Sequence, residues 1–301
     1  MRVYTHNDCL LHDPGSGHPE CPARLEAVIG ALHQAFPQLQ WHAAPLATRE
    51  QLARVHARGL IANVLDTPVA DSLRLDPDTV LSSDSAHAAL RACGAGIAAV
   101  DSALGGEAKR AFCAVRPPGH HATGDTAMGF CLFNSIAVAA AHALATHRLQ
   151  RVAIVDFDVH HGNGTEAIFQ GRPQVLYLSS HQSPLYPGTG LASEHGNIVN
   201  ATLPPGSGSA AFRAAWTTDL LPALENFAPE LLLISAGFDA HRLDPLADLN
   251  LDAADYQWLS GELAAIAERH AQGRIVSMLE GGYSLSALRE CSVAHLRGLG
   301  A

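Results

Sequence analysis

Short apolar segments alternate with longer helical patterns through most of the chain. The short segments are typical of buried strands, and we predict strands at residues 2–5, 111–115, 152–155, 175–178, 230–235 and 274–279. The longer patterns predict helices at residues 23–34, 85–104, 133–147, 164–170, 210–227 and 252–271, with one more helix closing the chain. Continuous apolar strands separated by helices predict an α/β fold with three layers, α-β-α, and a mostly parallel central sheet. We expect a single domain over residues 1–301, because no repeat or linker interrupts the pattern.

Local signals place several helix boundaries. Pro22 suits the first turn of a helix, and Thr48 and Gln51 have the spacing of a capping box. Gly94 and Gly96 imitate part of a dinucleotide-binding fingerprint, but no strand precedes them. We therefore interpret them as glycines that allow close helix packing.

Composition and charge exclude several classes of protein. The net charge of −10 is spread along the chain, which argues against nucleic-acid and polybasic membrane partners. The sequence contains no apolar run long enough to cross a bilayer and no signal peptide at its start. The six cysteines form no CxxC pair, so we expect free thiols and a cytoplasmic protein.

Polar clusters follow four of the predicted strands. These clusters are His120–His121, Asp156–His161, Asp239–His241 and Glu280–Tyr283. Ligands of open parallel sheets bind outside the carboxyl ends of the strands. We therefore expect the four clusters to meet at one edge of the sheet.

The cluster after residues 152–155 indicates a metal site. In an extended chain Asp158 and His160 would point to the same side, so both can reach one ion. Asp239 would supply a third ligand, which leaves a fourth position open for water. Three such ligands with an open position are typical of a catalytic zinc ion, which activates water and polarises a carbonyl group. We expect one Zn²⁺ per chain.

The remaining polar residues of this edge suit acid–base chemistry. His120 and His121 would move protons; Asp156 would orient one imidazole and Asn163 the other. Only the imidazole that has a carboxylate partner should gain a raised pKa. Tyr283 could donate its hydroxyl to a developing oxyanion.

These motifs together resemble the zinc-dependent histone deacetylase family, in particular its class II-like bacterial amidohydrolases. The matching segments are Arg116–Ala122, Gly129–Cys131, Asp156–Thr165, Tyr186–Gly190, Ser235–Asp239, Asp244–Leu246 and Leu279–Tyr283. The resemblance implies the arginase–deacetylase fold and hydrolysis of an N-acetyl amide, with acetyl-lysine or a small acetylated amine as substrate. It assigns zinc to Asp158, His160 and Asp239, and it makes His121 the general base and acid.

The resemblance also implies parts that the residues alone do not. A tunnel for the acetylated chain would be lined by Gly129, Phe130, Tyr186, Leu246 and Gly282. A structural potassium ion is expected from Asp156, Asp158, His160, Ser179 and Ser180. Arg24 matches the arginine of an internal acetate channel. His161 has no direct zinc role in this scheme, and we expect it to pack or to form hydrogen bonds beneath the site.

Three alternatives remain open from sequence. An acetylpolyamine amidohydrolase would need acidic residues at its mouth, for which Asp84, Asp125 and Glu194 are candidates. An arginase-like ureohydrolase would need a bridging carboxylate where this chain has Gly162. A catalytically inactive acetyl-amine binding protein would lack one of the catalytic groups, and none is missing. Asn163 and Glu280 differ from the class I pattern, but both fit the class II-like branch. The sequence carries no signal for an oligomeric state.

Overall fold

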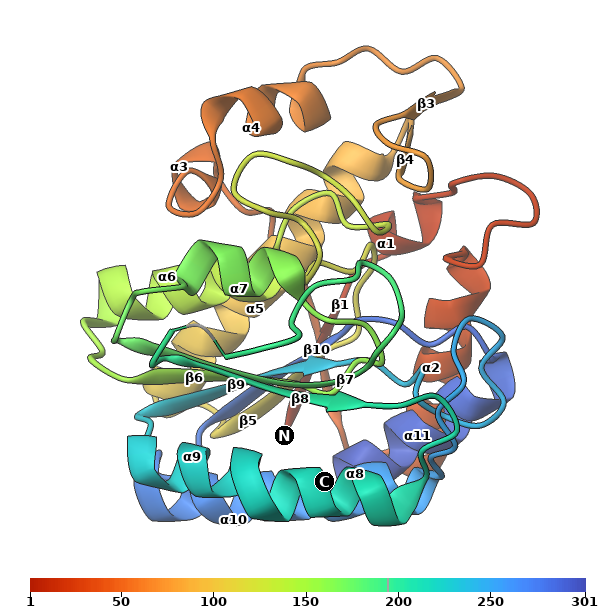
Figure 1. The fold of residues 1–301 in the computed structure, drawn as a ribbon. Helices are drawn as coiled ribbons and strands as arrows, with labels where there is room; N and C mark the ends of the chain where they lie inside the picture. The colour runs from red at the N-terminus through yellow and green to blue at the C-terminus, as the bar shows by residue number, and fades with distance from the viewer. Residues whose placement is uncertain (194) are drawn as a thin grey trace.

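A parallel sheet forms the centre of the computed structural model, which describes residues 1–193 and 195–301 (Figure 1). Its eight strands run in the order β2-β1-β5-β10-β9-β6-β7-β8, and every neighbouring pair is parallel. The strands are β1 (Arg2–Thr5), β2 (Gln40–Ala43), β5 (Arg110–Cys113), β6 (Val152–Asp156), β7 (Val175–Gln182), β8 (Ile198–Leu203), β9 (Leu231–Ala236) and β10 (Ile275–Leu279). A separate antiparallel pair joins β3 (Ser72–Arg74) to β4 (Val80–Ser82).

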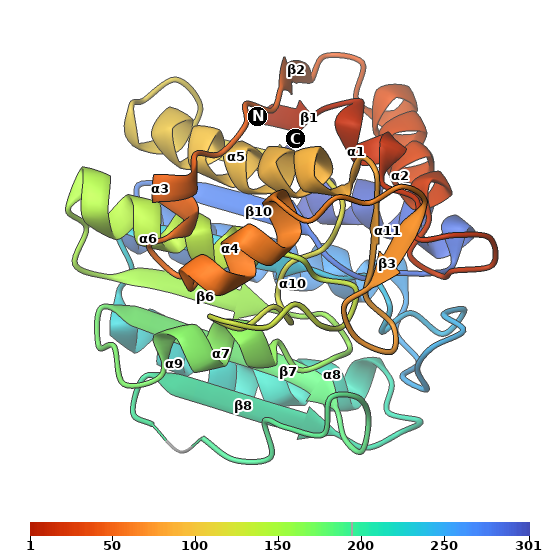
Figure 2. The ribbon, with the colours of Figure 1, turned by 90° about the horizontal axis from the view of Figure 1, so that it is seen from above.

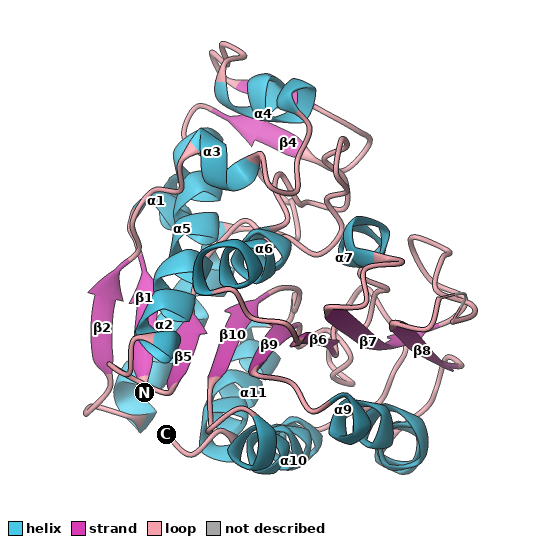
Figure 3. Ribbon diagram, turned by 90° about the vertical axis from the view of Figure 1, so that its left-hand side faces the viewer, coloured by secondary structure: helices cyan, strands magenta, loops and turns pink. Residues whose placement is uncertain are grey.

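Helices cover both faces of the sheet, which confirms the predicted α-β-α architecture (Figure 3). One face carries α5 (Ser85–Leu104), α6 (Ser135–His147) and α7 (Asn163–Phe169). The other carries α8 (Ser209–Ala215), α9 (Leu221–Phe227), α10 (Ala253–His270) and α11 (Leu285–Gly298), and α2 (Pro22–Ala35) packs against α11. The short helices α3 (Arg49–Leu52) and α4 (Arg58–Leu65) lie outside the α5–α6 layer, and α1 (Asp8–Leu11) packs against α2 and α5 (Figure 2).

The central strands are apolar because they are buried on both faces. Every residue of β6, β9 and β10 is buried, so alternation between polar and apolar positions is lost and a continuous apolar run remains. Gly96 of α5 serves helix packing, as predicted, because a Cβ there would lie 3.1 Å from the Cβ of Ala139 on α6. Gly94 instead packs against a loop, where a Cβ would overlap the carbonyl oxygen of Pro45.

The two edge strands escaped prediction from sequence. β2 contains no fully buried residue, and β8 has buried residues only at its two ends. Edge strands are half-exposed and tolerate polar residues, so the apolar run that marks a central strand is absent.

The boundaries of the predicted helices agree with the structure except in one segment, whereas the short helices α1 and α4 were not predicted. The capping box of Thr48 and Gln51 is present, and the Asn134 side chain accepts a hydrogen bond from the backbone N–H of Ala137 at the start of α6. The predicted helix at residues 210–227 is instead divided by a π-helical turn at Trp216–Leu220. All six cysteines are free, and five of them are buried. No helix in the described part of the chain is long and apolar enough to span a membrane.

Candidate active site

The four polar clusters meet at one edge of the sheet. The strands that precede them, β5, β10, β9 and β6, are consecutive neighbours in the sheet. Because these strands are parallel, their carboxyl ends lie together, and the residues that follow them are brought within contact distance. The sheet order therefore explains why positions far apart in the sequence form one site.

Asp158, His160 and Asp239 form a compact donor set. Their ligand atoms all lie within 4.8 Å of one another, and all three residues are buried. The His160 Nδ1 atom lies 3.0 Å from Asp158 Oδ1 and 3.2 Å from Asp239 Oδ2. The reason given from sequence is wrong in one respect. Asp158 and His160 follow the end of β6 in bent backbone, so alternation along an extended strand does not bring them together.

The chemistry of this donor set fits a divalent cation. Asp239 Oδ2 is buried and accepts no hydrogen bond from any described residue. Burial alone would lower the pKa of His160, but the carboxylates of Asp158 and Asp239 raise it to about 10. The pocket therefore favours positive charge. Gly281 leaves room for the carboxylates, since a Cβ there would overlap Asp239 Oδ2.

Each member of the histidine pair has its own partner. The His120 Nδ1 atom lies 2.9 Å from Asp156 Oδ2, and the His121 Nδ1 atom lies 2.8 Å from Asn163 Oδ1. The two ring centroids are 4.0 Å apart. The structure thus pairs one imidazole with a carboxylate and the other with a neutral amide.

These partners separate the proton affinities of the two histidines. Burial opposes a charge on His120, but the carboxylates of Asp156 and Asp158 outweigh it and hold the pKa of His120 well above its ordinary value. For His121, burial and the neighbouring imidazoles of His120 and His160 hold the pKa well below its ordinary value. These directions favour the charged form of His120 and the neutral form of His121.

A cavity of about 230 Å³ leads to this pair. It is lined by Asp78, His121, Gly129, Phe130, His160, Leu185, Tyr186, Leu246 and Tyr283. The Tyr186 ring meets the His121 ring edge-on, with centroids 5.2 Å apart. Four of the five predicted tunnel residues line the cavity. Gly282 does not line it, and its carbonyl oxygen accepts a hydrogen bond from Arg24 Nε at 2.6 Å.

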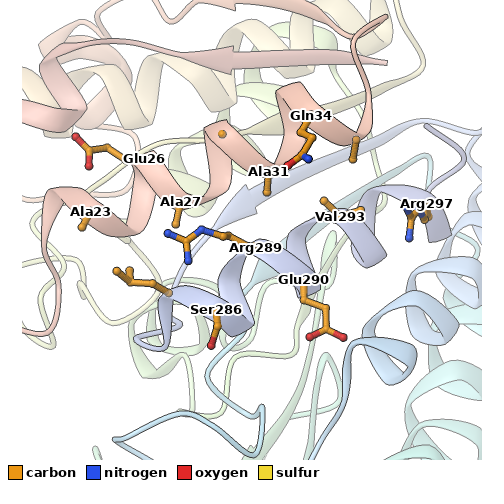
Figure 4. A pocket seen from close by; sticks show the side chains of 13 residues that line it. Ala23, Glu26, Ala27, Ala31, Gln34, Ser286, Arg289, Glu290, Val293 and Arg297 are labelled. Carbon is orange, nitrogen blue, oxygen red and sulfur yellow. The ribbon is translucent and has the colours of Figure 1, made fainter.

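A larger cavity of about 880 Å³ lies elsewhere, between α2 and α11 (Figure 4). Ala23, Ala27 and Ala31 line one side, and Arg289 and Val293 line the other. None of the predicted site residues lines this cavity. Its size therefore does not mark it as the site of the chemistry.

Two buried arginines support the site from behind. Arg24 and Arg116 both pair with the carboxylate of Glu20, and all three side chains are fully buried. The Arg24 guanidinium also donates to the carbonyl oxygens of Gly282 and Glu280, and it lies 4.9 Å from the centre of the Tyr283 ring. The predicted acetate-channel role of Arg24 stays a prediction. Glu20 escaped sequence analysis because its partners lie 4 and 96 residues away.

Two further acids, to which the sequence analysis gave no role, hold the backbone of the site. Asp244 Oδ2 accepts a hydrogen bond from the Tyr283 N–H at 2.7 Å, and burial raises the pKa of Asp244 to about 7. Glu280 Oε2 accepts from the N–H groups of Gly119 and His120 at 2.7 and 3.2 Å. Asp244 could have been identified from sequence, because it lies in Asp244–Leu246, one of the segments that carry the family resemblance.

His161 does not belong to the donor set and forms hydrogen bonds, as expected. Its Nδ1 atom is 2.8 Å from Thr189 Oγ1 and its Nε2 atom is 3.0 Å from Glu166 Oε2. The contact with Thr189 connects the segment that carries the zinc-ligand candidates to the loop that carries Tyr186.

The structure also locates the residues expected at the potassium site and the tunnel mouth. Ser179 is the register partner of Asp156, whereas the Ser180 hydroxyl accepts a hydrogen bond from Trp216 Nε1. Asp84 and Asp125 do not line the 230 Å³ cavity. Glu194 lies outside the described residues.

Known proteins share both the sequence and the fold of this chain. Residues 18–299 match the family model described as histone deacetylase domain. Histone deacetylase 14 (chloroplastic) of Arabidopsis thaliana is 37% identical over 99% of this chain and 76% of its own length. A histone deacetylase-like amidohydrolase of Pseudomonas aeruginosa is 38% identical over 94% of this chain and 77% of its own. The crystal structure of the HDA15 HD domain matches with a TM-score of 0.93 and 36% identity, covering 99% of this chain and 87% of that one. The chain therefore belongs to the histone deacetylase family.

Proposed function

We propose that the chain is a zinc-dependent deacetylase that hydrolyses the N-acetyl amide of acetyl-lysine in a protein or peptide, or of a small acetylated amine. One observation carries the proposal. Two imidazoles with opposite proton affinities lie beside a three-ligand donor set at the end of a narrow cavity. Hydrolysis of an amide needs a base, an acid and charge stabilisation at one carbonyl group, and this arrangement offers all three.

Asp158, His160 and Asp239 would hold one zinc ion. Zinc bound by such a set supplies a Lewis acid and lowers the pKa of a bound water to about 7. The orphaned oxygen of Asp239 and the preference of the pocket for positive charge support this assignment.

His121 would act as general base and then as general acid. Its Nδ1–H donates to the Asn163 carbonyl oxygen, which leaves a lone pair on Nε2. His121 also lines the cavity, and its lowered pKa keeps the imidazole neutral and able to accept a proton. The proton taken from water at Nε2 would then pass to the departing amine. His120, held charged by Asp156, would stay protonated and stabilise negative charge nearby.

Tyr283 would hold the acetyl carbonyl oxygen. Burial holds the pKa of its hydroxyl well above the ordinary value, so the group stays protonated and can donate a hydrogen bond. The backbone of Tyr283 is fixed by Asp244, and its ring lies 5.8 Å from the Phe130 ring in the cavity wall. This fixed position suits a donor that must meet charge as it develops.

The apolar wall favours an alkyl chain as the substrate arm. Phe130, Tyr186 and Leu246 line the cavity, and Asp78 is the one acid among its described lining residues. The two described acids proposed for a polyamine mouth do not line it. Acetyl-lysine is therefore the substrate we propose first. A potassium ion near Asp156 and Ser179 remains part of the proposal through the family resemblance.

The decisive assay compares substrates on one preparation. Acetyl-lysine peptides, acetylputrescine and acetylspermidine are each incubated with the enzyme before chelation, after chelation and after zinc is restored. We expect turnover of the peptides that is lost on chelation and regained with zinc. Faster turnover of the acetylpolyamines would overturn the substrate assignment, and two tightly bound manganese ions per chain would overturn the zinc deacetylase.

Two substitutions test the residue roles. His121→Ala and Tyr283→Phe should each lower kcat by about 10²- to 10⁴-fold while zinc stays bound. Tyr256→Phe is the matched control, since the Tyr256 hydroxyl is buried away from the cavity and has no hydrogen-bond partner among the described residues. Near-full activity of either test variant would show that the roles are misassigned.

A further inference from the structure

A second group of metal-ligand side chains lies between α5 and α6. The Oδ1 atom of Asp101 on α5 is 2.7 Å from His142 Nε2 and 2.7 Å from His147 Nε2, and both histidines belong to α6. The ligand atoms of the three residues all lie within 4.8 Å of one another. His142 is buried, His147 is half-buried, and the Asp101 side chain is 50% exposed, so an ion could reach the cluster from solvent.

This cluster is separate from the candidate active site. The helix α6 begins beside the site, where the Asn134 side chain donates to the carbonyl oxygen of Ala122. His142 and His147 lie in the second half of the same helix, which spans Ser135–His147 and rises about 1.5 Å per residue. The cluster therefore faces the neighbouring helix α5 (Figure 2), and not the cavity that leads to the histidine pair.

The chemistry of the three ligands selects one class of ion. Imidazole nitrogens bind zinc, copper, iron and nickel, whereas calcium and magnesium prefer oxygen ligands. Two imidazoles and one carboxylate, with the remaining positions open to water, suit a borderline divalent ion. We propose that Asp101, His142 and His147 form a second site for a divalent transition-metal ion of the Zn²⁺ type, which would join α5 to α6.

Binding of a metal ion requires a change of tautomer at both histidines. Each Nε2–H now donates to Asp101 Oδ1, so each imidazole must move this proton to Nδ1 before Nε2 can bind an ion. At His142 the Nδ1 atom accepts a hydrogen bond from Arg54 NH1 at 2.9 Å and lies 3.3 Å from Thr146 Oγ1. The protonated Nδ1 would donate to Thr146, and Arg54 would have to turn away.

Arg54 therefore opposes the ion in two ways. It holds His142 in the wrong tautomer, and its positive charge repels a cation. This opposition distinguishes a metal site from a cluster that is held only by hydrogen bonds. Removal of the Arg54 guanidinium should strengthen metal binding, although it removes a contact.

A similar surface cluster supplies the matched control. Glu225 also pairs with a histidine, His270, at 2.7 Å, but its other partner is Arg269, which cannot bind a metal. One imidazole and one carboxylate make a weak site. Substitution of His270 should therefore leave metal uptake unchanged.

The experiment counts zinc per chain after equilibrium dialysis of the whole protein against Zn²⁺, and calorimetry measures the affinity. We expect the parent to bind one equivalent more than His147→Gln or Asp101→Asn. These variants should lose about 100-fold or more in affinity for that equivalent. Arg54→Gln should bind it about tenfold more tightly, and His270→Gln should match the parent.

The zinc content of each variant is compared with that of the parent. The difference therefore does not depend on how much zinc the candidate active site holds. Equal zinc content in the parent and His147→Gln would overturn the proposal. Weaker binding in Arg54→Gln would also overturn it, because the tautomer and charge arguments would then be wrong. Deacetylation by His147→Gln should equal that of the parent, and its loss would contradict the separation of the two sites.

Discussion

Glu20 is a buried carboxylate behind the site that pairs with two buried arginines. Its Oε1 atom lies 2.8 Å from Arg24 NH1 and 2.5 Å from Arg116 Nε, and its Oε2 atom lies 2.7 Å from Arg116 NH2. Burial disfavours the carboxylate, but Arg116, His12 and Arg24 outweigh it and hold the pKa of Glu20 well below its usual range. Glu20→Gln keeps the shape of the side chain and removes its charge.

The expected loss of stability follows from the burial of all three partners. Breaking a buried ion pair by removing one charge lowers the free energy of unfolding by about 3–5 kcal/mol. An unfolding entropy of about 2.1 cal/mol/K per residue gives roughly 0.6 kcal/mol/K for this chain of 301 residues. The midpoint of thermal unfolding should therefore fall by about 5–8 °C. Catalysis should fall as well, because Arg24 fixes the carbonyl groups on either side of Gly281 and lies over Tyr283.

Calorimetry and urea unfolding measure this loss, and a surface pair supplies the control. Asp66 pairs with Arg49, but the two side chains are 54% and 55% exposed. Asp66→Asn should change the free energy of unfolding by about 1 kcal/mol or less. If Glu20→Gln behaved like Asp66→Asn, the reasoning from burial would be refuted.

Three further predictions concern the metal, the core and the histidine pair. Gly281→Ala should lower zinc content by one equivalent relative to the parent, measured by metal analysis, because its Cβ would overlap Asp239 Oδ2; a zinc content equal to that of the parent would contradict this. Burial lowers the pKa of His295 to about 3, so below about pH 6.5 the unfolded state binds a proton that the folded state does not, and stability falls on acidification. This term amounts to about 2 kcal/mol between about pH 7 and 5, and urea unfolding of His295→Gln should lack it; an unchanged pH dependence would refute the assignment. Asn163→Asp should place a carboxylate beside His121 Nδ1 and move the acid limb of kcat/KM up by about 1–3 pH units, and an unmoved limb would show that His121 is not the base.

Local sequence determined the central elements and the chemical types at the site. The apolar run at residues 152–155 becomes the buried strand β6, and the acids and histidines after it lie where the strand ends. Burial on both faces makes a central strand uniformly apolar, so its position can be predicted without knowing its neighbours. The partners of the histidine pair were also predictable, because Asp156 and Asn163 lie in the same short motif.

Only the tertiary structure decided which distant groups meet. The sheet order places β9 beside β6, and this alone brings Asp239 to His160 across 79 residues of chain. The edge strands were hidden because half-exposed positions tolerate polar residues, and Glu20 was hidden because its partner Arg116 lies 96 residues away. The cluster of Asp101 with His142 likewise spans 41 residues and depends on how α5 packs on α6. The spacing of residues along the chain predicts contacts within one turn, helix or strand. Contacts between distant elements depend on how those elements pack, which a local sequence pattern does not predict.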